Sequence, residues 1–150
     1  MIVDEFIKQM ENLKVLHRDS IEGCTTDEIA QLKKIQNIGK LPPLYVEFLS
    51  KLGKKAGAFG VGSDMFYPVL LELKEEAIYI LDEEAGLIPN DAFVFYIHHG
   101  YIVWYFRTDV INSSIFEINV DSRSEGSHEI FKDFAQLLDY FVELYKRLQT

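Results

Sequence analysis

The chain has 150 residues, of which 48% are apolar and 13% aromatic, enough for one domain with a hydrophobic core of its own. It has a single cysteine, so an internal disulfide is excluded. It contains no run of 18 or more apolar residues, so no membrane-spanning helix is predicted. Its net charge is −9, and because acidic surfaces repel nucleic-acid phosphates, we expect no direct binding of nucleic acid.

The negative charge lies almost entirely in the second half of the chain. Residues 1–75 have a net charge of −1, whereas residues 76–150 have a net charge of −8. Such a surface attracts a basic partner and speeds the encounter with it, although acidic surfaces also simply keep proteins soluble. The N-terminus has acids where a signal peptide needs basic residues, so we expect a cytoplasmic protein.

Three helices are predicted in the first third of the chain. Apolar residues at three- and four-residue spacings predict the first helix over residues 2–17. Thr25 and Glu28 form a capping-box pattern at the start of the second helix, which Gly39 ends. The third helix opens at residues 41–43, Leu-Pro-Pro, because proline is tolerated in the first turn.

Glycines interrupt the stretch after the third helix. Residues 57–62 read Gly-Ala-Phe-Gly-Val-Gly, which matches neither glycine fingerprint of nucleotide-binding loops, so a mobile loop is predicted. Residues 65–71 are apolar but contain Pro68, which favours an edge strand or a turn. A helix is predicted next, from Leu73 to near Gly86.

The strongest strand signal lies in the second half of the chain. Residues 93–97 and 101–106 are β-branched and aromatic, with His99-Gly100 between them as a turn, so they predict a hairpin. Neither strand alternates cleanly between apolar and polar residues, which is typical of central strands that are covered on both faces.

A third strand over residues 114–119 and a polar loop over residues 121–127 follow the hairpin. The spacing of apolar residues then predicts a long helix from about residue 130 to residue 148. Helices therefore precede a mostly antiparallel sheet, and a long helix closes the chain. This order predicts an α+β fold in a single domain over residues 1–150, with the N-terminal helices and the C-terminal helix packed on a central sheet.

No residue pattern indicates catalysis or a metal site. Cys24 has no base or cation beside it in the sequence, which favours a structural thiol. His98 and His99 are adjacent on a predicted strand, where side chains point to opposite faces, so we expect their rings to diverge rather than share a metal. No nucleophile elbow surrounds Ser113 or Ser114. We therefore expect a protein that is not an enzyme and has no cofactor.

Three segments carry a resemblance to a known family. Residues 25–29, Thr-Thr-Asp-Glu-Ile, precede residues 41–49, whose pattern is Leu-Pro-x-x-Tyr-x-x-Phe-Leu. The aromatic hairpin at residues 93–106 comes next, and then the apolar start of the last helix, Phe134, Leu137 and Leu138. In order and spacing these segments resemble the SUKH superfamily, which includes immunity proteins of bacterial polymorphic toxin systems and is related to eukaryotic cell-wall synthesis regulators.

The resemblance covers about residues 25–145, and the helix at residues 1–18 is then interpreted as a family-specific extension. It implies a non-enzymatic immunity-type protein that binds and neutralises a partner toxin, for example a basic nuclease. The chain departs from the family pattern in two places. The double glycine after the third helix is reduced to Gly53, and the Gly-Asp step of the hairpin is replaced by His99-Gly100. These departures affect the assignment to a subfamily more than the expected fold.

Two sets of residues are the candidate binding sites. For a basic partner protein we expect acids that follow or lie on the strands of the acidic half, namely Asp109, Glu117, Asp121 and Glu125. The alternative function is a regulatory or small-ligand-binding module. Its aromatic-lined pocket would be formed by Tyr67, Tyr96 and Trp104, together with Asp109.

Overall fold

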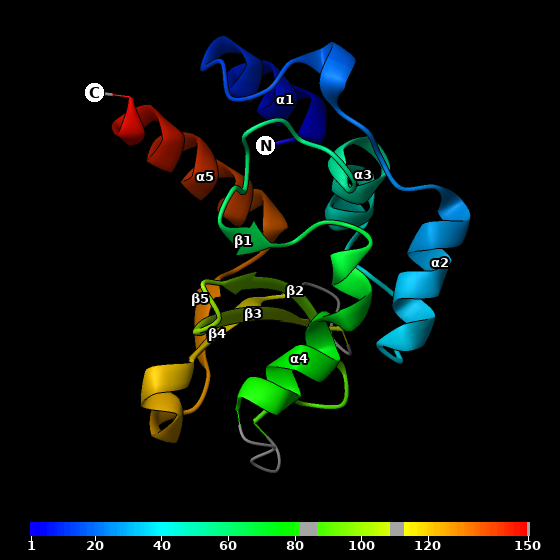
Figure 1. The fold of residues 1–150 in the computed structure, drawn as a ribbon, viewed down its shortest axis with the longest axis vertical. Helices are drawn as coiled ribbons and strands as arrows, with labels where there is room; N and C mark the ends of the chain where they lie inside the picture. Colours follow the sequence, from blue (N-terminus) through cyan, green and yellow to red (C-terminus); the bar gives the residue numbers. More distant parts are fainter. Residues whose placement is uncertain (82–86, 109–112, 150) are drawn as a thin grey trace.

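An antiparallel sheet lies at the centre of the structure, and its strands follow one another in chain order (Figure 1). The computed structural model describes residues 1–81, 87–108 and 113–149. In this part of the chain the strands are β1 (Ser63–Asp64), β2 (Ala92–His98), β3 (Ile102–Arg107), β4 (Ile115–Asn119) and β5 (His128–Phe131). The predicted α+β class with an antiparallel central sheet is confirmed.

Helices cover both faces of the sheet. Three of them lie on one side (Figure 1): α1 (Val3–Asn12), α3 (Pro43–Leu52) and α5 (Phe134–Leu148). α4 (Leu73–Ile80) lies on the other side. α2 (Thr26–Ile35) contacts α3 and the short 3-10 helix η2 (Val69–Glu72), which in turn contacts β2. As predicted, α5 and α3 pack on the sheet. α1 instead packs against α3 and α5, and α2 packs against α3 and η2.

The starts of α2 and α3 follow the local signals in the sequence. The Thr25 hydroxyl accepts a hydrogen bond from the Glu28 N–H at 3.1 Å, and the Thr25 N–H donates to the Glu28 carboxylate at 2.8 Å. This is the predicted capping box. α3 begins at Pro43, and Gly53 is its C-cap residue. One face of α3 is buried, and it carries Tyr45, Phe48, Leu49 and Leu52.

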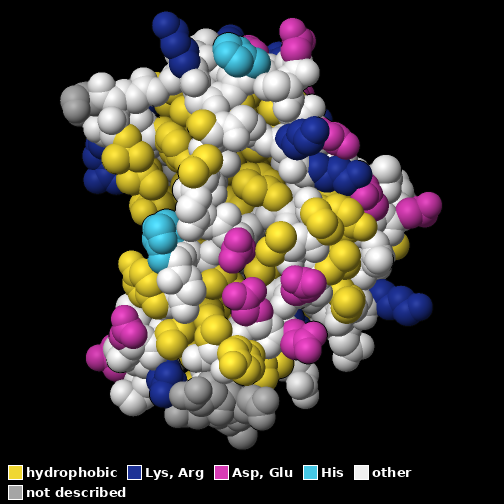
Figure 2. Space-filling model, in the orientation of Figure 1, with side chains coloured by type: hydrophobic (Ala, Val, Ile, Leu, Met, Phe, Trp, Pro, Cys, Tyr) yellow, Lys and Arg dark blue, Asp and Glu magenta, His cyan; other side chains and the backbone are white. Residues whose placement is uncertain are grey.

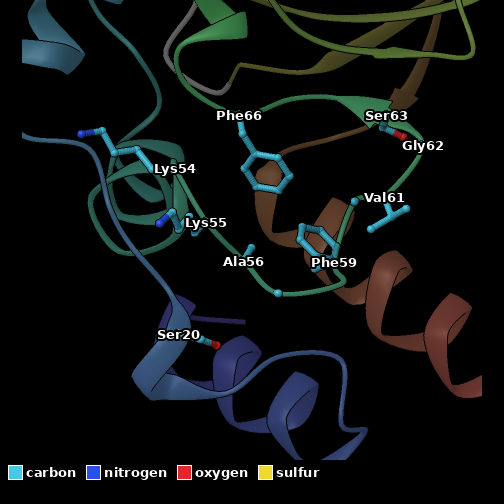
Figure 3. A pocket seen from close by; sticks show the side chains of 11 residues that line it. Ser20, Lys54, Lys55, Ala56, Phe59, Val61, Gly62, Ser63 and Phe66 are labelled. Atoms are coloured by element: carbon cyan, nitrogen blue, oxygen red, sulfur yellow. The ribbon is translucent and has the colours of Figure 1, made fainter.

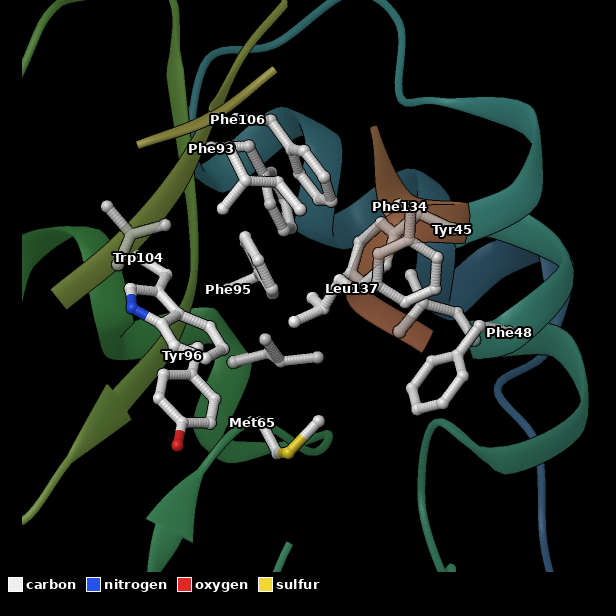
Figure 4. Packing of buried hydrophobic residues seen from close by; sticks show 14 of the residues in the cluster. Tyr45, Phe48, Met65, Phe93, Phe95, Tyr96, Trp104, Phe106, Phe134 and Leu137 are labelled. Carbon is white, nitrogen blue, oxygen red and sulfur yellow. The ribbon is translucent and has the colours of Figure 1, made fainter. Parts of the chain in front are cut away.

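The β2–β3 hairpin forms the middle of the core, and its side chains are buried on both faces, as the lack of alternation predicted. Phe95 and Phe106 stack with 4.3 Å between their ring centroids. The Tyr45 ring of α3 lies 5.0 Å from Phe106 and 5.2 Å from Phe134 of α5 (Figure 4). These aromatic contacts join the sheet to α3 and α5 in one core.

A buried glutamine completes the edge of β2. Within the described chain, β1 pairs only with Ile97 and His98, so the earlier part of β2 lacks a neighbouring strand there. The Gln36 side chain, at the C-terminal end of α2, donates to the Val94 carbonyl at 2.9 Å and accepts from the Val94 N–H at 2.7 Å. It also donates to the Leu70 carbonyl at 3.3 Å. The Gln36 amide therefore satisfies both backbone hydrogen-bonding groups of Val94, which a neighbouring strand would otherwise satisfy.

The first helix ends earlier than predicted. α1 stops at Asn12, and Lys14 has a φ of 62°. The Val15 N–H donates to the Met10 carbonyl, a hydrogen bond typical of a Schellman helix end. Leu16 continues the helical spacing of apolar residues in the sequence. It is buried in the core, but it lies in a non-helical segment after α1. The helical spacing of apolar residues therefore continues in the sequence past the end of α1, which is why the predicted helix was too long.

The last helix begins later than predicted because a strand precedes it. Residues 128–131 form β5, which pairs with β4. α5 begins at Phe134, and the Asp133 side chain accepts a hydrogen bond from a backbone N–H of its first turn. Most of the predicted polar loop over residues 121–127 is the 3-10 helix η3 (Val120–Glu125).

The segment before α4 also differs from the prediction. Residues 65–71 form a turn that leads into η2, and the strand in this region is the two-residue β1. α4 ends at Ile80, whereas the helix end predicted near Gly86 lies outside the described residues.

Candidate functional site

Acidic side chains from β1, η2 and α4 meet on one face of the molecule. Burial raises the pKa of Glu76, and the nearby charges of Asp64 and Glu72 raise it further. Over residues 1–81, 87–108 and 113–149, no cation forms an ion pair with any of these three carboxylates. Figure 2 shows acidic side chains gathered at the centre of this face, with hydrophobic ones beside them. The negative charge here is therefore not neutralised within the described chain.

Exposed apolar side chains lie next to these acids on α4. Ile78 is 41% exposed and Tyr79 is 75% exposed. On a helix, residues three positions apart are neighbours, so Ile78 lies beside Glu75, and Tyr79 lies beside Glu76. The surface thus combines charge with accessible apolar area. We call it the α4 face, and its residues are Asp64, Glu72, Glu75, Glu76, Ile78 and Tyr79.

The lysine of α4 is directed away from these acids. The Lys74 ammonium donates to the carbonyl of Gln36 at 2.7 Å and to the carbonyl of Asn90 at 2.9 Å. Burial lowers the pKa of Lys74. It therefore links α4 to α2 and to the segment before β2, and it leaves the charge of the α4 face negative.

The acids that the sequence singled out lie elsewhere. Asp109 falls outside the described residues. Glu117 is half-buried on β4, opposite Trp104 of β3. Asp121 and Glu125 are exposed on η3, so the structure places these two together and leaves Glu117 on the sheet. The sequence did not single out the α4 face.

The predicted aromatic pocket is not formed by the described residues. Tyr96 and Trp104 stack with 4.0 Å between their ring centroids, and both are buried. The Tyr67 hydroxyl instead donates to Gln31 at 2.8 Å, and the Lys54 ammonium lies over the Tyr67 ring. Because two of the three aromatic side chains fill the core, the small-ligand alternative loses the site on which it rested.

A different cavity, of about 450 Å³, lies beside the glycine-rich segment after α3. We call it the glycine-loop cavity. Its walls include Phe59 and Phe66, and Lys54 and Lys55 lie at the opposite end from Gly62 and Ser63 (Figure 3). Both lysines already form ion pairs with glutamates. The cavity is therefore not a simple anion site.

The two adjacent histidines do not diverge as predicted. Their ring centroids are 4.0 Å apart, with the rings nearly perpendicular. The reason is that His99 has a φ of 50° and lies in the turn, so the alternation of a strand stops at His98. The His98 Nδ1 lies 2.7 Å from the Ser63 Oγ. Among the described residues, no three His, Cys, Asp or Glu side chains are grouped as a metal site.

His98 should make the stability of the protein depend on pH. Burial lowers the pKa of His98, and His99 lowers it further; Ser63, Tyr96 and Tyr101 are its other neighbours. The unfolded chain therefore takes up this proton first, and the free energy of unfolding should fall as the pH drops from about 6.5 through the folded-state pKa. Urea unfolding at pH 7.5 and 5.5 measures this loss. His98→Gln should reduce it, and an unchanged loss in that variant would assign it to another group.

Cys24 is a structural thiol in this fold, as the sequence favoured. Burial raises its pKa to about 11, and the charge of Glu28 contributes to the same shift. The Cys24 N–H donates to the Leu49 carbonyl at 2.7 Å, which ties this segment to the end of α3. At neutral pH the side chain is therefore protonated and a poor nucleophile.

None of the described helices has the length and apolar character needed to cross a bilayer. The chain matches no known family model, and no curated protein is significantly similar to it.

Proposed function

We propose that this chain is an immunity-type protein that binds a partner toxin and neutralises it without catalysing a reaction. The resemblance of the sequence to the SUKH superfamily indicates this class of function. The α4 face is the surface that we assign to the partner. A toxin with a basic surface, such as a nuclease with a cationic cleft, is complementary to that face in charge.

The observation that carries the proposal is the combination of unneutralised acids and exposed apolar side chains on the α4 face. Burial and the charges of Asp64 and Glu72 raise the pKa of Glu76, so its negative charge is less stable in the free protein than that of a glutamate in water. A lysine or arginine of the partner relieves this repulsion. Tyr79 adds an exposed aromatic side chain, a residue type that contributes strongly to binding at protein interfaces.

The α4 face can be tested by reversing its charge. The double variant Glu72→Lys, Glu76→Lys should slow association with a basic toxin at least about tenfold at low salt, because electrostatic steering is lost. Stopped-flow or surface-plasmon measurements with the purified product of the adjacent gene provide the rate. Growth of cells that express this toxin together with each variant reports neutralisation.

A matched control uses the acids that the sequence singled out. Asp121→Lys, Glu125→Lys changes the net charge by the same amount at exposed positions of η3, and we expect near-wild-type association. If only the η3 variant loses binding, the function stands and the α4 face is the wrong surface. If wild-type protein neither binds nor neutralises the adjacent gene product, the proposed function is wrong.

A further inference from the structure

A serine and a histidine meet where β1 pairs with the end of β2. Ser63 lies directly opposite His98 in the register of the two strands, so the two side chains share one face of the sheet. The Ser63 Oγ lies 2.7 Å from the His98 Nδ1, within hydrogen-bond distance. With Nδ1 unprotonated, the hydroxyl donates its proton towards the imidazole, which is the arrangement of a nucleophile and its base.

The histidine ring is held in position by its neighbours. The Tyr96 ring lies nearly parallel to it at 6.0 Å, and His99 packs against it edge-on. Tyr96 is itself fixed by its stack on Trp104. Tyr96 and His99 are therefore positioning residues for the base. Burial and His99 also lower the pKa of His98, which keeps its imidazole neutral and able to accept a proton at pH 7.

The serine can be reached from the glycine-loop cavity. Ser63 is half-buried and lines the end of this cavity beside Gly62 (Figure 3). Gly62 is exposed, has a φ of 91° and carries no side chain that would cover the serine. The walls formed by Phe59 and Phe66 are apolar, and a cavity of about 450 Å³ accommodates a small acyl compound.

We propose that Ser63 is a nucleophile that accepts the acyl group of a small activated ester, with His98 as its general base. The Ser63 oxygen forms a bond to the acyl carbon as the bond from that carbon to the leaving oxygen breaks. The Ser63 proton moves to the His98 Nδ1 and from there to the leaving oxygen. The products are an acylated serine and a free alcohol, and no oxidant, reductant or metal is required. This activity is independent of toxin binding through the α4 face.

The same cavity contains an internal control. Ser20 also lines it and is exposed, but its hydroxyl donates to the backbone carbonyl of His17 rather than to an imidazole nitrogen. A general base typically accelerates such a step by a factor of about 100 or more. Ser63 should therefore react about 100-fold faster than Ser20 with an electrophile that enters this cavity.

The test uses a small alkyl fluorophosphonate, whose serine adduct accumulates because it hydrolyses slowly. The Ser63 oxygen displaces fluoride from phosphorus, and peptide mass spectrometry over time gives the labelling rate of each serine. In folded His98→Asn protein, Ser63 labelling should fall to the rate of Ser20. His128→Asn, at an exposed position of β5 outside this pair, should stay within about threefold of the wild-type rate.

Two results would overturn the proposal. The first is labelling of Ser63 no faster than labelling of Ser20 in the unmodified protein, a comparison that needs no variant. The second is wild-type labelling of Ser63 in a His98→Asn protein whose circular dichroism and thermal unfolding show that it is folded.

Discussion

Replacing Gln36 by leucine should lower the free energy of unfolding by about 3 kcal/mol or more. The Gln36 side chain forms two hydrogen bonds with the backbone of Val94 and one with that of Leu70. Leucine has a similar volume but no polar atoms, so it leaves the N–H and C=O of Val94 buried without a partner at the edge of β2. Each such group costs about 1–3 kcal/mol.

A neighbouring glutamine provides the matched control. Gln31 lies on the same helix, α2, but is exposed and bonds only the Tyr67 hydroxyl among the described residues. Gln31→Leu should change the free energy of unfolding by no more than about 0.5 kcal/mol. Urea titrations followed by circular dichroism compare the two variants. Equal losses in both would show that Gln36 does not act through the backbone of β2.

The parts of the fold that could be predicted are those that local sequence determines. The capping box at Thr25 and the proline start of α3 at Pro43 depend on residues within one helical turn. The hairpin at residues 92–107 is specified by two dense runs of β-branched and aromatic residues around His99-Gly100. In each case the signal and the structure that it specifies lie within a few residues of each other.

The parts that could not be predicted depend on residues far apart in the sequence. β5 has only four residues, and nothing within them shows that β4 is available as a pairing partner. Gln36 is buried because Val94, 58 positions later, needs its amide. The rings of His98 and His99 were predicted to diverge as if both residues lay on a strand, whereas His99 has a positive φ and lies in the turn.

The candidate site shows the same limit. Asp64 joins Glu72 and Glu76 only because β1 pairs with β2 and brings the start of this segment beside α4. Because the negative charge lies mostly in the second half of the chain, the partner-binding acids were predicted there. Two of these three acids, however, lie in residues 1–75. Net charge therefore indicated the chemistry of a partner but not the surface that would meet it.

Replacing Gly23 by alanine should destabilise the protein by about 3 kcal/mol or more, because there is no room for a side chain. A Cβ at this position would lie 1.8 Å from the Ser50 carbonyl oxygen and 2.3 Å from the carbon that carries it. Both atoms belong to the backbone of α3, so they cannot move aside as a flexible side chain would. The adjacent Cys24 N–H donates to the Leu49 carbonyl, and this bond would be strained as well.

Gly39→Ala separates lack of space from the general effect of removing a glycine. Apart from Gly39 itself and its two chain neighbours, no atom of the described residues lies within 4 Å of a Cβ at this position, and its φ is not positive. Alanine there restricts only the unfolded chain, so this variant should be neutral or up to about 1 kcal/mol more stable than wild type. For a chain of this size, the Gly23→Ala loss corresponds to a fall in Tm of about 6–12 °C. Calorimetry that found equal Tm values for the two variants would mean that the segment around Gly23 does not pack against α3 in solution.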